Sequence, residues 1–141
     1  MALAIAGAAI LFLCIALIVA VTRDPGPQPD DVAMAYELAW DHLDFESLWT
    51  LSGQELHDGL DKAAFVAAKR AAYASRPELG RLAREVTFAE VTAARDNAVV
   101  RTRVVLRDGD VVHNQIQLAR RDGRWLVVGY RLESETPQPR T

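Results

Sequence analysis

The sequence predicts an α+β domain in which three helices pack on a four-stranded antiparallel meander, a cone-like roll, behind an N-terminal transmembrane helix. Four short apolar runs between Arg84 and Leu132 predict the strands. Each of the three tripeptides between these runs ends in a residue that tolerates a positive φ angle, as a three-residue hairpin loop requires. Helical patterns precede the strands, an order typical of helices that cover one face of an antiparallel sheet. The tripeptides are Arg95-Asp96-Asn97, Arg107-Asp108-Gly109 and Arg121-Asp122-Gly123.

The N-terminal segment is an unbroken apolar run. Residues 2–21 contain no charged residue and no proline, and a helix of this length spans about 30 Å, the thickness of the hydrocarbon layer of a membrane. We therefore expect a transmembrane helix or an uncleaved signal anchor, with a single pass through the cell membrane. Residues 22–29 are rich in proline and predict an extended linker. Arg23 follows the apolar run and, taken alone, favours a cytoplasmic domain.

The folded domain is expected over residues 30–132, and residues 133–141 form a tail without apolar periodicity that is expected to be disordered. Apolar residues at helical spacing predict the three helices, and an aspartate that can act as N-cap precedes each of them. The expected N-cap residues are Asp30 or Asp31, Asp44, and Asp61. The third helix is expected to end near Ser75, before Arg76-Pro77.

Composition excludes several classes of function. The net charge is −3, whereas a domain that binds nucleic acid normally carries a basic excess. The single cysteine, Cys14, lies in the apolar run, so the domain is expected to contain no disulfide. The three histidines lack the spacing of metal ligands, and no phosphate-binding loop or nucleophile motif is present, so neither a metal nor a cofactor is expected. The histidines are His42, His57 and His113.

The order of elements, the Leu48-Trp49 turn and the stretch Asp-Gly-Arg-Trp-Leu-Val-Val-Gly-Tyr at 122–130 carry a family resemblance. Over residues 30–132 the chain resembles the nuclear transport factor 2-like (NTF2-like), or cystatin-like, superfamily. It looks most like the small bacterial exported or membrane-anchored branches, including lumazine-binding-like domains of unknown function. The resemblance implies a cone that encloses a pocket, which some members use as an active site and others for ligand binding or as a scaffold. It also implies a domain outside the cytoplasm, against the indication from Arg23.

Counting strand register from the three loops predicts one polar row across the apolar face of the sheet. The row contains Glu90, Thr102, Asn114 and Tyr130. In one interpretation the row lines a pocket, where Glu90 acts as a general base while Asn114 and Tyr130 donate hydrogen bonds. In the other, the row is a satisfied internal network, or it lies at the open edge of the cone where water solvates Glu90.

The opposite face of the predicted sheet is polar and basic. Arg103, His113 and Arg131 fall in one row, which could bind anionic headgroups or phosphate, or could simply be solvated. Trp125 and Val127 lie further along the same predicted face. They could mediate self-association into a homodimer.

Three classes of function therefore stay open. The first is a membrane-anchored, non-catalytic domain that binds a small apolar ligand or a protein partner. The second is an isomerase, dehydratase or cyclase that uses Glu90 as its base. The third is a scaffold subunit that dimerises through the outer sheet face.

Overall fold

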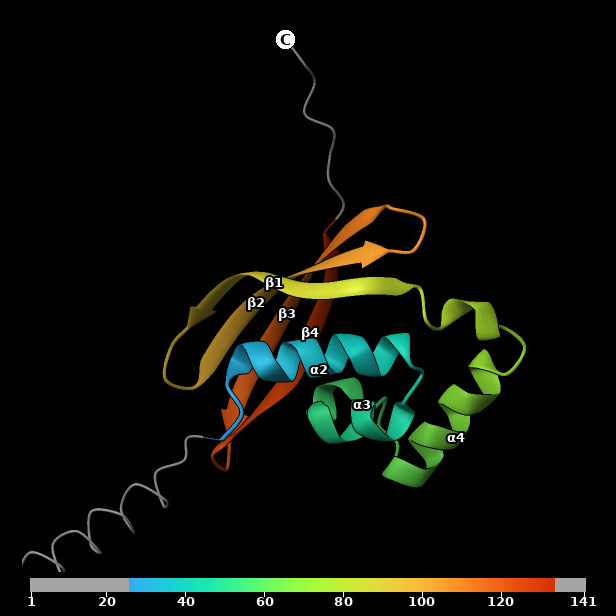
Figure 1. Cartoon of the computed structure of the whole chain (residues 1–141). Helices are drawn as coiled ribbons and strands as arrows, with labels where there is room; N and C mark the ends of the chain where they lie inside the picture. The colour runs from blue at the N-terminus through green and yellow to red at the C-terminus, as the bar shows by residue number, and fades with distance from the viewer. Residues whose placement is uncertain (1–25, 134–141) are drawn as a thin grey trace, which may run out of the picture.

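The computed structural model describes residues 26–133. Helices precede a four-stranded sheet, as the sequence predicts (Figure 1). The α-helices are α2 (Pro29–Asp41), α3 (Phe45–Leu51) and α4 (Lys62–Tyr73), with short 3₁₀ turns η1 (Gln54–Leu56) and η2 (Pro77–Leu79). The strands are β1 (Ala83–Ala93), β2 (Asn97–Leu106), β3 (Val111–Arg121) and β4 (Arg124–Glu133).

The sheet is an antiparallel meander in the order β1-β2-β3-β4. Helix α2 crosses one face of the sheet, with α3 and α4 beyond its C-terminal half (Figure 1). The predicted α+β class is therefore confirmed. The predicted membrane segment, residues 2–21, and the first half of the linker, residues 22–25, lie outside the described residues, as does the tail after Glu133. Within residues 26–133 no helix is long and apolar enough to cross a membrane.

Side-chain caps position the helices. The carboxylate of Asp44 accepts a hydrogen bond from the backbone N–H of Ser47 at 3.1 Å, and Asp61 caps α4 in the same way. Helix α2 begins earlier than predicted, because Pro29 occupies its first turn and the N-cap is Gln28 rather than Asp30 or Asp31. Asp31 is then inside the helix, where its carboxylate accepts from the backbone N–H of Gln28 at 3.1 Å.

The core lies between the helices and the central strands. Ala33 of α2, Val100 of β2 and Ile116 of β3 have no solvent-exposed surface, and Leu48 of α3 is 1% exposed. Aromatic side chains of the helices pack around them. The helices are thus held to the sheet by apolar contact, which leaves polar groups on this face in need of partners.

The loop between β2 and β3 has the predicted three residues, with φ of +96° at Gly109. As predicted, Thr102 pairs with Asn114, and Arg103 with His113. The other two loops are one residue shorter, because Ala93 pairs with Ala98 and Arg121 with Arg124.

The shorter loop between β1 and β2 moves Glu90 opposite Arg101, whereas the polar row required it to lie opposite Thr102. A bulge between Phe88 and Glu90 shifts the register again, so Phe88 lies opposite Thr102. Since neighbouring residues of a strand point to opposite faces, Glu90 lies on the face opposite Thr102. The predicted place of Glu90 in the row is wrong.

In β4 the shorter loop reverses the predicted orientation of the first half, and a bulge after Val127 restores the predicted facing of the second half. Val127 pairs with Leu118, and Tyr130 with Ile116. Val127 has no exposed surface and belongs to the core, and Trp125 is partly buried against the core. These two residues therefore do not form the outer-face surface that the sequence suggested for dimerisation.

Candidate ligand pocket and its buried carboxylate

A buried carboxylate, that of Glu37, lies where α2 crosses the sheet. Glu37 is 6% exposed. Its Oε1 atom accepts a hydrogen bond from the hydroxyl of Thr102 at 2.6 Å and another from the side-chain amide of Asn114 at 2.8 Å. The neighbouring strands β2 and β3 thus provide two hydrogen-bond donors to one carboxylate of α2. We call Glu37, Thr102, Asn114 and the adjacent Tyr130 the Glu37 cluster.

Burial controls the protonation of this cluster. Removal from water raises the pKa of Glu37, and the hydrogen bonds from Thr102 and Asn114 partly oppose the shift. Burial and the nearby Glu37 carboxylate also raise the pKa of Tyr130, so its hydroxyl keeps its proton and can donate. The Oδ1 atom of Asn114 is buried and has no hydrogen-bond partner among the described residues. The cluster therefore has one free acceptor.

The raised pKa of Glu37 predicts a pH dependence of folding stability. Above the ordinary value of 4.5, the folded protein keeps a proton that the unfolded chain has lost, so the free energy of unfolding should fall as pH rises toward the folded pKa. Glu37→Gln cannot ionise and should lack this decrease. Urea denaturation of both proteins at several pH values measures it. Parallel pH profiles of the two proteins would show that Glu37 has no shifted pKa.

Sequence reasoning predicted part of this cluster. Thr102 and Asn114 are adjacent as expected, and Tyr130 lies one pair further along the same face. Glu90 is exposed on the other face, and Glu37, which the sequence analysis did not single out, supplies the carboxylate. A signal was available, because Glu37 follows Ala33 by four residues and precedes Trp40 by three, which places it on the buried face of α2.

Beside the cluster lies an open pocket of about 430 Å³ between α2, α3, α4 and β4. Five aromatic side chains line it: Tyr36, Trp40, Phe65, Tyr73 and Tyr130. The rings of Tyr36 and Tyr130 lie 5.9 Å apart, and those of Trp40 and Tyr73 lie 6.1 Å apart. We call this hollow the aromatic pocket. Tyr130 connects it to the Glu37 cluster.

One cation stands among the rings of the aromatic pocket. The ammonium group of Lys69 lies 5.3 Å from the ring centre of Phe65 and 5.9 Å from that of Trp40, distances typical of cation–π contacts. Its ion pair with the exposed carboxylate of Asp58 measures 3.3 Å. A ligand that carries an acceptor group could therefore meet Lys69 without losing contact with the rings.

A smaller hollow of about 200 Å³ adjoins the aromatic pocket, and Trp40 and Tyr130 line both. Glu37 and Asn114 also line the smaller hollow, whose other walls are mainly apolar. Leu132, at its rim, is 61% exposed. The smaller hollow thus gives access to the Glu37 cluster from a second side.

The outer sheet face does not form the predicted row of anion-binding residues. Arg103 and His113 do pair, but the shorter loop and the bulge in β4 together place Glu133 opposite His113 and move Arg131 opposite Gln115. Glu133 also forms an ion pair of 2.6 Å with Arg101. A carboxylate therefore stands where a third cation was expected. Nowhere in residues 26–133 do three His, Cys, Asp or Glu side chains gather that could hold a metal ion.

Comparisons with known proteins identify the fold. No protein-family model and no curated protein matches the sequence. Among solved structures, a Campylobacter jejuni protein assigned as an NTF2-like transpeptidase superposes with a TM-score of 0.53 and 19% identity over 72% of this chain and 97% of its own. A SEC-C motif containing protein from Rhodopseudomonas palustris gives 0.55 and 17%, over 86% of this chain and 90% of its own.

At this level of identity the likeness concerns the fold alone. The particular resemblance to lumazine-binding-like domains is not supported by these structures. The broader resemblance is confirmed, and the chain has an NTF2-like fold.

Proposed function

We propose that this domain binds a small, ring-shaped and largely apolar molecule in the aromatic pocket. The observation that carries the proposal is the pocket itself: about 430 Å³, open to solvent and walled by five aromatic side chains. Ligand pockets are typically about 300–1,000 Å³, mostly apolar, and contain a few polar groups that fix the orientation of the ligand. Attachment to the cell membrane through residues 2–21 is part of the same proposal and rests on the apolar run, whereas the location of the domain outside the cytoplasm rests on the family resemblance.

The polar groups of the pocket limit the chemistry of the ligand. Tyr130 stays protonated and presents a hydroxyl group at the inner wall, while Lys69 presents a cation at the wall formed by α4. A flat ring fits between the aromatic side chains, and a hydroxyl or carbonyl group on that ring would meet Tyr130. The favoured ligand is therefore an aromatic or alicyclic ring with one or two oxygen substituents.

Binding of 2-naphthol, measured by titration calorimetry, tests the proposal. Tyr130→Phe should weaken binding about tenfold, the effect of losing one hydrogen bond of about 1.4 kcal/mol. Tyr73→Phe is the matched control, because it removes a hydroxyl from a tyrosine that also lines the pocket but lies outside the Glu37 cluster. No saturable binding of 2-naphthol to the unmodified protein, or equal losses in the two variants, would overturn the proposal.

A further inference from the structure

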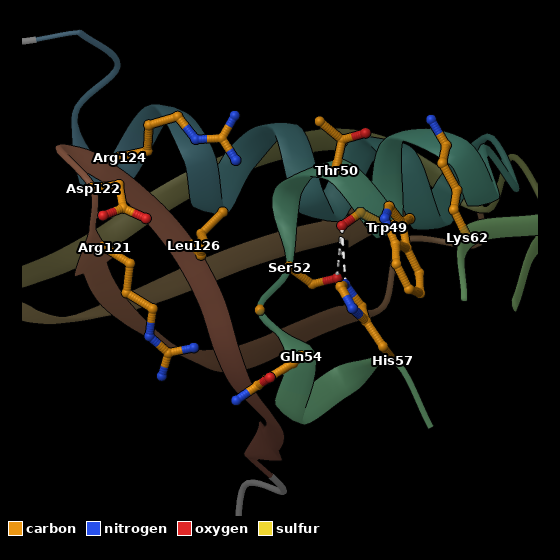
Figure 2. A pocket seen from close by; sticks show the side chains of 11 residues that line it. Trp49, Thr50, Ser52, Gln54, His57, Lys62, Arg121, Asp122, Arg124 and Leu126 are labelled. Carbon is orange, nitrogen blue, oxygen red and sulfur yellow. Dashed lines mark hydrogen bonds between the residues drawn. The ribbon is translucent and has the colours of Figure 1, made fainter. Parts of the chain in front are cut away.

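A third hollow lies on the other side of α3 from α2, and it is polar. It measures about 770 Å³ and runs between the start of β4 and the segment from α3 to the first residue of α4. Figure 2 shows Arg121 and Arg124 along one wall and Lys62, Trp49 and His57 along the other. We call this hollow the basic groove.

The charges that line the basic groove do not balance. Three cations, Lys62, Arg121 and Arg124, lie beside two carboxylates, that of Asp122 and that of Glu55, which pairs with Arg121. The whole chain carries a net charge of −3, so this local excess of positive charge runs against its overall charge. Among the described residues, neither Lys62 nor Arg124 has an ion pair or a side-chain hydrogen bond. Two exposed cations are therefore free to meet an anion.

The third cation is held in place. Both terminal nitrogens of Arg121 contact the carboxylate of Glu55, one of them at 3.0 Å. This pair closes over Gly53, where an added Cβ atom would lie 2.5 Å from Glu55 Oε2 and 3.0 Å from Arg121 Nη1. Gly53 also donates its backbone N–H to the carbonyl of Val127 in β4 at 2.8 Å. The floor of the groove is thus joined to the edge of the sheet.

An aromatic pair forms part of the opposite wall. The rings of Trp49 and His57 stack with their centres 3.4 Å apart and their planes at 13°. The Nε2 atom of His57 lies 3.2 Å from the backbone carbonyl of Trp49 (Figure 2), and it carries the proton of this hydrogen bond because a carbonyl oxygen only accepts. Both rings are half-buried. A fixed aromatic surface therefore lies within the same groove as the free cations.

We propose that the basic groove is a second binding site, for a small organic dianion that carries a ring, such as an aryl phosphate. Lys62 and Arg124 approach the charged group from opposite walls, and the ring lies against the Trp49–His57 pair. Arginine and lysine together suit the several oxygens of a phosphate group. The aromatic pair favours a ring over a bare ion. The groove and the aromatic pocket are separate hollows that share Ser52 in their linings, and the two proposals do not depend on each other.

Phenyl phosphate, titrated into the full-length protein at low salt, tests this site. We expect saturable binding with a Kd below about 1 mM that weakens as salt is added. The double variant Lys62→Gln/Arg124→Gln should bind about ten times more weakly. The matched control is Arg84→Gln/Arg131→Gln, which removes the same charge from exposed positions outside the groove and should change the Kd less than about twofold.

Three results would overturn the proposal. Equal losses in the two double variants would mean attraction by overall charge alone. Inorganic phosphate that binds as tightly as phenyl phosphate would exclude the contact with the aromatic pair. If the protein binds vesicles that contain phosphatidylglycerol but does not bind phenyl phosphate, the groove would be assigned to lipid headgroups. Binding of 2-naphthol should be the same in both double variants, which separates failure of this site from failure of the aromatic pocket.

Discussion

Replacing Glu37 with alanine should lower the free energy of unfolding by about 2–4 kcal/mol, because two buried donors lose their acceptor. The hydroxyl of Thr102 and the amide of Asn114 both donate to Glu37 Oε1, and each is buried where water does not reach easily. The Oδ1 atom of Asn114 is already without a partner among the described residues. Urea denaturation followed by circular dichroism at neutral pH measures the loss.

Two further variants make this experiment specific. Glu37→Gln keeps an acceptor oxygen for both donors, so it should cost less than Glu37→Ala. Glu90→Ala removes an exposed carboxylate from the opposite face of the sheet and should change stability by no more than about 0.5 kcal/mol. A loss below about 1 kcal/mol in Glu37→Ala would mean that water from the adjoining hollow satisfies the donors. A large loss in Glu90→Ala would contradict the observed register.

The class of the fold could be predicted because its signals are local. The aspartate caps of α3 and α4, apolar periodicity and Gly109 each act within a few residues, and they place these two helices and the turn between β2 and β3 correctly. The other two turns differ because their tripeptides fit more than one loop. At Asp122 and Gly123 both residues adopt positive φ, +50° and +76°, which makes a two-residue hairpin turn.

Register across the outer strands depends on contacts that a strand's own sequence does not reveal. In β4, Val127 and Val128 are both apolar, so alternation of polar and apolar residues does not show which of them faces the core. The structure buries Val127 completely, because the two-residue loop before β4 sets its register, and a bulge after Val127 changes the facing again. The two-residue loop before β2 likewise moves Glu90 to the outer face. A change of one residue in loop length, or a bulge, reverses the facing of every residue beyond it.

The Glu37 cluster could be predicted only in part, because its members come from distant segments. Thr102 and Asn114 belong to strands whose register was predictable, so their adjacency followed from the sequence. Glu37 precedes them by 65 and 77 residues, and no local pattern indicates which helix residue will lie above them. A carboxylate on the apolar face of a helix nevertheless indicates that buried hydrogen-bond donors lie nearby, because a buried carboxylate without partners would be costly.

Leu48→Ala should destabilise the domain by about 2–5 kcal/mol and at the same time enlarge the aromatic pocket. Leu48 is 1% exposed in the core and also lines that pocket. The space left by its side chain therefore joins an existing hollow of about 430 Å³. If the pocket is a binding site, 2-naphthol should raise the melting temperature of Leu48→Ala more than that of the unmodified protein.

Leu118→Ala provides the matched comparison, because Leu118 is 2% exposed in the same core but does not line the aromatic pocket. The two substitutions remove the same atoms, so both should lower stability by about 2–5 kcal/mol. The void left at Leu118 is too small for a naphthalene ring, and 2-naphthol can stabilise this variant only through the unchanged pocket. The increase in melting temperature should thus be larger for Leu48→Ala than for Leu118→Ala. Equal increases would show that the space beside Leu48 is closed to ligands, and the aromatic pocket would then end at the rings that line it.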